Sequence, residues 1–162
     1  MAVNRYLPHV FVVPEDDANR QLANGFLLDP YLVPRKIQVL EEAGGWTKVL
    51  DRFRSDHVSG MDAYPGRFMV LLIDFDSQEG RLAEVQAVIP ERLRDRVFVL
   101  GVWTEPEDLK PTFGPSYEAI GQDMAKDCRE GTGATWERDL LRHNAGEIDR
   151  LRLQVRPILF SR

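Results

Sequence analysis

The sequence of 162 residues has the length of one domain, and its 43% hydrophobic and 29% charged residues exclude an intrinsically disordered chain. A formal net charge of −5 argues against a broad phosphate-binding surface, because nucleic-acid-binding domains usually carry a basic excess. A single cysteine, Cys128, excludes an intramolecular disulfide. Without a long apolar stretch or a signal-peptide pattern, we expect a cytoplasmic protein with no membrane contact.

The first part of the chain alternates short apolar runs with helical patterns. A β-branched run ends at Pro14, and the glycines Gly44 and Gly45 end the second run. In chain order these patterns predict a strand at 10–13, a helix at 18–28, a strand at 36–40 and a helix at 46–53. Asp16 or Asp17 is the expected N-cap of the first helix. Residues 57–66 contain two glycines and a proline, which predicts a loop.

The strongest strand pattern follows that loop. Residues 68–73 are six consecutive apolar residues, and a helix at 80–88 and a strand at 97–103 are expected after them. Helical patterns at 116–129 and 134–155 come next, and residues 156–160 are expected to form a last strand or an extended tail.

This order predicts an α/β fold with a mostly parallel central sheet of about four strands and helices on both faces, a Rossmann-like three-layer sandwich. We expect residues 1–112 to form the α/β core and residues 113–162 to form a helical extension packed on the same domain. The extension adds a pair of helices whose polar faces alternate acidic and basic side chains. That pattern is usual for a solvated face, and it is also compatible with a protein partner or a homo-oligomer.

Acidic residues follow three of the predicted strands. Ligand sites in open parallel sheets form at the carboxyl ends of strands, so several carboxylates would share one region if the first and third strands are neighbours. Oxygen ligands without nearby histidine or cysteine suit Mg²⁺ or Mn²⁺. The residues concerned are Glu15, Asp16 and Asp17 after the first strand, Asp74 and Asp76 after the third, and Glu105 and Glu107 after the fourth.

The alternation in Asp74-Phe75-Asp76 bears on the geometry of such a site. In a continuing strand, residues two apart face the same side, so both aspartates could reach one metal ion while Phe75 points into the core. Acidic residues at strand-to-helix junctions also serve simply as helix N-caps, and this reading applies above all to Asp16 and Asp17.

With these residues in view, residues 8–109 resemble a Toprim domain, the metal-binding module of topoisomerases, primases and OLD-type nucleases. Glu15 stands where that family has its glutamate after the first strand, and Asp74-Phe75-Asp76 stands where it has its DxD motif. The resemblance implies Mg²⁺-dependent cleavage or transfer at phosphodiesters of nucleic acid. It implies Glu15 as the proton-transfer group, and Asp74, Asp76 and Glu15 as metal ligands, with Asp16, Asn19, Glu105 and Glu107 as accessory candidates.

Two departures from the family pattern support other functions. The glycine expected after the glutamate is missing, and Asn19 replaces an aspartate, so the chain could instead be an inactive Toprim-fold subunit of a larger complex.

The acidic pair after the first strand also resembles the acidic pair of a response-regulator receiver domain. That resemblance would make Asp74 a phosphoacceptor. The Toprim family also has a basic residue near the site, for which the candidates are Arg20, Lys48, Arg67 and Arg81.

Overall fold

The computed structural model, which describes residues 2–160, contains one sheet of four parallel strands. The strands are β1 (His9–Pro14), β2 (Ile37–Val39), β3 (Arg67–Leu72) and β4 (Val97–Leu100), and their order across the sheet is β2-β1-β3-β4. β1 and β3 occupy the centre and pair in register from His9 with Arg67 to Pro14 with Leu72. The predicted parallel sheet is confirmed, and the first and third strands are neighbours in it.

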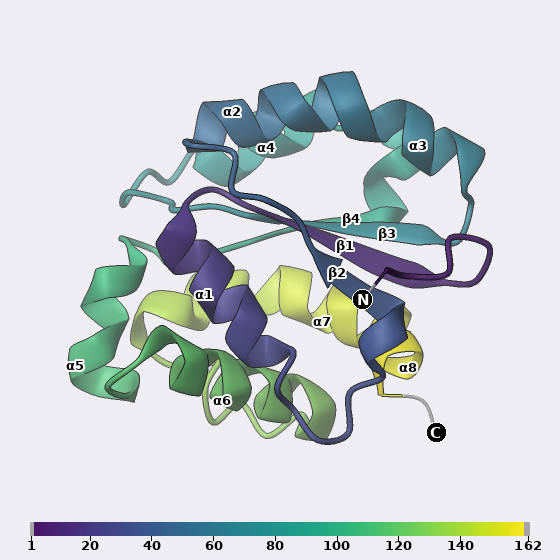
Figure 1. The fold of residues 1–162 in the computed structure, drawn as a ribbon. Helices are drawn as coiled ribbons and strands as arrows, with labels where there is room; N and C mark the ends of the chain where they lie inside the picture. The colour runs from purple at the N-terminus through teal and green to yellow at the C-terminus, as the bar shows by residue number, and fades with distance from the viewer. Residues whose placement is uncertain (1, 161–162) are drawn as a thin grey trace.

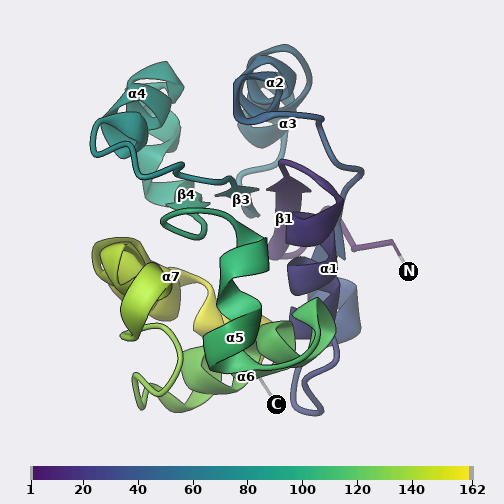
Figure 2. The ribbon, with the colours of Figure 1, turned by 90° about the vertical axis from the view of Figure 1, so that its left-hand side faces the viewer.

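Helices cover both faces of the sheet and complete a three-layer sandwich, as predicted (Figures 1 and 2). The first layer contains α2 (Trp46–Arg52), α3 (Val58–Ala63) and α4 (Arg81–Val88). The opposite layer contains α1 (Asp17–Phe26), α5 (Lys110–Phe113), α6 (Tyr117–Glu130), α7 (Ala145–Gln154) and α8 (Arg156–Leu159). None of the helices within residues 2–160 is long and apolar enough to span a membrane.

Each layer has its own hydrophobic core, because successive strand side chains point to opposite faces. Val12 of β1 packs into the core beneath α1, α6 and α7, whereas its neighbour Val13 packs into the core beneath α2 and α4. The helices after residue 112 contribute Ile120 and Ile148, among others, to the same core as Val12.

Three local predictions were wrong. Residues 57–66, expected as a loop, contain α3, which continues from α2 through a π-helical segment, Phe53–His57. The chain stays helical here because Met61 is fully buried in the core between these helices and the sheet. This burial outweighs the turn preference of the nearby glycines. The segment expected as a last strand or an extended tail instead forms the short helix α8 (Arg156–Leu159), with Leu159 buried against the sheet.

The expected helix over 134–155 is also interrupted. Residues 134–138 are a turn, a 3-10 helix follows at Asp139–Asn144, and only then does α7 begin. Asp139 has a left-handed backbone (φ 41°), which breaks helical continuity. The backbone N–H groups of Thr135 and Trp136 donate to a buried carboxylate, whereas those of Glu137 and Arg138 donate to carbonyls three or four residues earlier.

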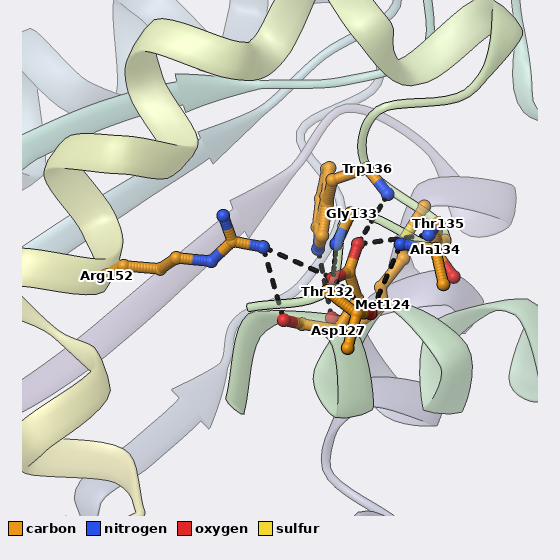
Figure 3. Close-up of polar contacts among 8 residues, drawn as sticks. All are labelled: Met124, Asp127, Thr132, Gly133, Ala134, Thr135, Trp136 and Arg152. Atoms are coloured by element: carbon orange, nitrogen blue, oxygen red, sulfur yellow. Dashed lines mark hydrogen bonds and ion pairs between the residues drawn. The ribbon is translucent and has the colours of Figure 1, made fainter. Parts of the chain in front are cut away.

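That carboxylate is Asp127, near the end of α6 (Figure 3). It accepts hydrogen bonds from the backbone N–H groups of Gly133 (2.6 Å), Thr135 (3.0 Å) and Trp136 (2.7 Å). Arg152 of α7 lies 3.3 Å from the same carboxylate. Asp127 therefore ties α6, the following turn and α7 together. Burial raises the pKa of Asp127, but the backbone N–H groups outweigh burial and leave the pKa below its usual value.

α1 and α6 cross closely at two glycines. A Cβ atom on Gly121 would lie 2.1 Å from the Leu22 carbonyl oxygen, and one on Gly25 would lie 2.3 Å from that of Glu118. Only glycine permits this approach of two backbones.

We expect Gly121→Ala to lower the free energy of unfolding by about 1–3 kcal/mol, because the methyl group would force the two helices apart. The matched control is Gly146→Ala in α7, where an added Cβ meets nothing within 4 Å. The control should leave stability unchanged or raise it by up to about 1 kcal/mol. Urea unfolding measures both variants, and equal stability of the two would show that the α1–α6 contact is not tight.

Candidate functional site

The acidic residues after β1 and β3 meet at the carboxyl end of the sheet. The backbone N–H of Glu15 donates to the Leu72 carbonyl (2.8 Å), which extends the pairing of the two strands. The Glu15 carboxylate then accepts a hydrogen bond from the backbone N–H of Asp74 (2.8 Å). Carboxylate oxygens of Glu15, Asp16 and Asp74 lie within 4.8 Å of one another and could hold a metal ion. We call these three residues the acidic triad.

Asn19 connects two members of the acidic triad. Asp16 is the N-cap of α1 and accepts from the backbone N–H of Asn19 (2.9 Å), which satisfies a free donor of the first helical turn. The Nδ2 group of Asn19 donates to Asp16 (2.9 Å) and also to Asp74 (2.8 Å). Asn19 is fully buried, and its Oδ1 atom has no hydrogen-bond partner among residues 2–160. The residue that departs from the Toprim pattern thus holds two carboxylates together.

The acidic triad disfavours full ionisation. Burial, together with the charge of Glu15, raises the pKa of Asp74 to about 7. The hydrogen bond from Asn19 acts in the opposite direction and lowers this pKa. Burial also raises the pKa of Glu15 to about 6, against the hydrogen bond from the Asp74 N–H. The repulsion between clustered carboxylates of this kind is relieved when the cluster takes up a proton or binds a cation.

These raised pKa values predict how stability depends on pH without divalent cations. Between about pH 4 and pH 7 the folded state holds protons on Glu15 and Asp74 that the unfolded state has lost, so rising pH destabilises the fold. Asp74→Asn removes the larger share of this effect. The variant should match the wild type near pH 4 and become more stable by about 1–2 kcal/mol at pH 8, a figure reduced for solvent screening.

Urea unfolding of both proteins across this range, with a chelator present, measures the difference. Burial lowers the pKa of His143 to about 4, so this residue makes stability rise with pH up to about pH 6.5, opposite to the acidic triad. The contribution of His143 is the same in both proteins and cancels in the difference between them. A constant stability difference between pH 4 and pH 8 would contradict the raised pKa of Asp74.

Asp76 lies outside the acidic triad. β3 ends at Leu72, and Asp76 has a left-handed backbone (φ 48°), so the two-residue alternation of a strand does not extend to it. Its carboxylate forms an ion pair with Arg81, which also donates to the Asp74 carbonyl oxygen (3.0 Å). Phe75 is buried in the core as expected. The charge of Asp76 still contributes to the raised pKa of Glu15, and its role as a ligand stays a prediction.

Among the basic candidates, Arg81 is the one that contacts the site. Its guanidinium stacks over the Trp46 ring at 4.3 Å, which fixes its position beside Asp74. Arg20 pairs with Asp17 and Glu42. Arg67 begins β3 and therefore lies at the opposite end of the sheet.

The two remaining accessory candidates are exposed and lie outside the acidic triad. Glu107 accepts a hydrogen bond from the Tyr117 hydroxyl (3.4 Å). The neighbouring charge of Glu107 raises the pKa of Glu105, with further contributions from Asp76 and Asp16. Glu105 is therefore near the same end of the sheet, and the accessory roles of both glutamates stay predictions.

The glycine pair after β2 also supports the site. The N–H groups of Gly44 and Gly45 donate to the Glu15 carbonyl oxygen at 2.8 and 3.2 Å. Both glycines have positive φ angles, 98° and 151°, which other residues rarely adopt. This pair thus fixes the backbone of Glu15.

Cys128 and His143 are in environments that do not favour a nucleophilic thiolate or a charged imidazole. Burial raises the pKa of the Cys128 thiol to about 12, so it is not a nucleophilic thiolate. Burial lowers the pKa of His143 to about 4, and its ring packs against Phe75 at 4.7 Å and Trp103 at 5.2 Å between centroids. His143 therefore supports the loops behind the acidic triad as a neutral ring.

Comparison of the chain with protein-family models, with curated proteins and with solved structures gives no match. The likeness to Toprim domains therefore rests on Glu15, Asp74 and Asp76 and on their places in the strand order.

Proposed function

We propose that the acidic triad binds one divalent cation, Mg²⁺ or Mn²⁺, and that the protein is a Toprim-like enzyme that cleaves or transfers phosphodiesters of nucleic acid. The observation that carries the proposal is the convergence of Glu15, Asp16 and Asp74 from two adjacent strands. The donor set fits a hard cation, since all three groups offer oxygen. The buried Oδ1 atom of Asn19 accepts no hydrogen bond within residues 2–160. A bound cation, or a water molecule on that cation, would give this oxygen a partner.

The residues of the site have separate roles in this proposal. Asp74 and Asp16 hold the cation, and Asn19 keeps their oxygens at one place through its two donated hydrogen bonds. Glu15 transfers the proton, because its carboxylate lies beside the oxygens of Asp16 and Asp74 and is held there by the Asp74 N–H. Arg81, fixed by Trp46 and Asp76, places a positive charge beside the site. A bound cation would stabilise negative charge developing on a phosphoryl oxygen.

The proposal predicts cleavage of single- or double-stranded DNA or RNA oligonucleotides when Mn²⁺ or Mg²⁺ is present. Glu15→Gln keeps the size of the side chain but cannot take up a proton, so we expect cleavage to fall by about 10²–10⁴-fold. Glu79→Gln is the matched control, an exposed glutamate that should retain full activity. Equal cleavage by both variants would exclude Glu15 as the proton-transfer group.

A second candidate is a non-catalytic subunit that keeps the fold and binds a protein partner. The observation that favours it is Asp76, which pairs with Arg81 instead of joining the acidic triad. Purification of the protein as a stable complex, with no cleavage by either the complex or the isolated chain, would favour this candidate. Cleavage by the isolated wild-type chain that is lost in Glu15→Gln would exclude it.

A further inference from the structure

A buried arginine lies at the end of the sheet opposite the acidic triad. Arg67, the first residue of β3, is only 8% exposed. Among residues 2–160 no carboxylate forms an ion pair with it. Buried charges in proteins are normally paired with an opposite charge, because desolvation of an unpaired ion is costly. The local structure therefore leaves Arg67 without a counter-ion.

The guanidinium of Arg67 is held rigidly. Its Nε–H donates to Nε2 of His9 (3.0 Å), and Nδ1 of His9 lies 2.7 Å from the Leu7 carbonyl oxygen. His9 must therefore carry its proton on Nδ1 and be neutral. The guanidinium carbon lies 4.3 Å from the centroid of the Phe11 ring and 4.8 Å from that of Tyr64. Stacking on two rings orients the group without using its outer N–H donors.

The outer edge of the guanidinium is free. Neither Nη atom of Arg67 has a hydrogen bond within residues 2–160, and neither is sealed from solvent as the buried unpaired atoms are. A Cβ atom on Gly60 would lie 2.7 Å from Nη1, so α3 packs closely against this side of the guanidinium and only glycine leaves space for Nη1 there. The Nη groups thus keep N–H donors that no acceptor within residues 2–160 uses, and guanidinium donors of this kind bind phosphate and carboxylate oxygens.

The surroundings are mostly basic. Arg5 donates to the Tyr64 hydroxyl (3.4 Å), and its guanidinium carbon lies 5.5 Å from the centroid of the same ring that Arg67 contacts. Arg67 also acts electrostatically on His57 and on His9. Nε2 of His57 is buried without a hydrogen-bond partner. The acidic group that acts on His57 is its exposed neighbour Asp56. Two arginines and an unpaired histidine nitrogen favour an anion of more than one charge.

We propose that Arg67, with Arg5 and His57 beside it, binds a phosphate group, either inorganic phosphate or the phosphate of a small monoester. The site is separate from the acidic triad, which lies at the other end of β1 and β3. Its binding therefore does not depend on the metal chemistry proposed above.

The test is a titration of the protein with inorganic phosphate and, separately, with glycerol phosphate, followed by ¹H–¹⁵N NMR through the backbone amides of residues 57–67 in every variant and, where Arg67 is present, through its Nε–H resonance. We expect saturable shifts with a millimolar Kd, and none with sodium chloride at matched ionic strength. Equal affinities would assign recognition to the phosphate group alone, and tighter binding of the ester would add contacts beyond it. Absence of a saturable shift with both ligands in the wild type would overturn the proposal.

Variants separate binding from a structural role. Arg5→Ala changes an exposed side chain and should weaken phosphate binding by about threefold. Arg67→Met keeps the length of the side chain, should abolish binding, and should be at least as stable as the wild type in phosphate-free buffer, because it removes an unpaired buried charge. Arg142→Gln, an exposed arginine in the segment before α7, is the control that should bind normally. Full binding by Arg67→Met would refute the assignment.

Discussion

Replacing Asp127 with alanine should lower the free energy of unfolding by about 3–5 kcal/mol, the loss expected when one partner of a buried, hydrogen-bonded ion pair is removed. The substitution would leave the N–H groups of Gly133, Thr135 and Trp136 without an acceptor and Arg152 without a counter-ion. Because the pKa of Asp127 is lowered in the fold, its contribution is complete above about pH 4 and is lost as pH falls further. Urea unfolding at pH 7 measures the effect.

Asp123→Ala provides the matched control for this prediction. Asp123 lies one helical turn earlier on α6 and is exposed, so its removal should change stability by no more than about 0.5 kcal/mol. If Asp127→Ala were as stable as Asp123→Ala, the carboxylate would not organise the turn between α6 and α7.

The second large effect concerns the acidic triad. Mn²⁺ at 100 times its Kd should stabilise the wild-type fold by about 2.7 kcal/mol, because the ion binds the folded state alone. Asp74→Asn should lose this stabilisation, since the substitution removes a buried carboxylate from the cluster. Thermal unfolding with and without Mn²⁺, at a pH above the raised pKa of Asp74, measures the difference.

Two further variants show which carboxylates the stabilisation by Mn²⁺ depends on. Asp149→Asn changes an exposed aspartate of α7 and should respond to Mn²⁺ as the wild type does. Asp76→Asn tests whether the aspartate paired with Arg81 also serves as a ligand. A loss as large as that of Asp74→Asn would mean that Asp76 leaves Arg81 when the ion binds, whereas a small loss would restrict the site to the acidic triad.

Much of the fold could be predicted because its strands are uninterrupted apolar runs. The run over 68–73 predicted β3 closely, and Asp74 after it lies at the carboxyl end of the sheet with Glu15 and Asp16. The positions of the core strands followed from hydrophobicity alone, and the right-handed crossover rule then supplied the layers.

The sequence was misleading where side chains override local preference. The helical pattern over 134–155 contains no obvious stop, but Asp127 draws the backbone N–H groups of the turn toward itself from an adjacent helix. A side-chain hydrogen bond to a turn eight or nine residues away leaves no periodic signal. The same holds for α3, which forms because Met61 is buried between this helix and the sheet, although Gly60 and Gly66 favour a turn.

The composition of the site could be predicted only in part. The spacing of Asp74 and Asp76 suggested two ligands on one side of a strand, but β3 ends before them and Asp76 adopts a left-handed conformation. Asn19, considered only as an accessory residue, bridges Asp16 and Asp74, and Arg81 was one of four basic candidates without a motif. These roles depend on three-dimensional proximity that residue spacing does not encode.

The most direct test of the acidic triad is a count of bound ions. Titration with Mn²⁺, followed by the electron paramagnetic resonance signal of the free ion, should show one bound Mn²⁺ per chain in the wild type and in Asp149→Asn, and none at the same concentrations in Asp74→Asn. Equal binding by the wild type and Asp74→Asn, or no binding by either, would contradict a metal site built from Glu15, Asp16 and Asp74.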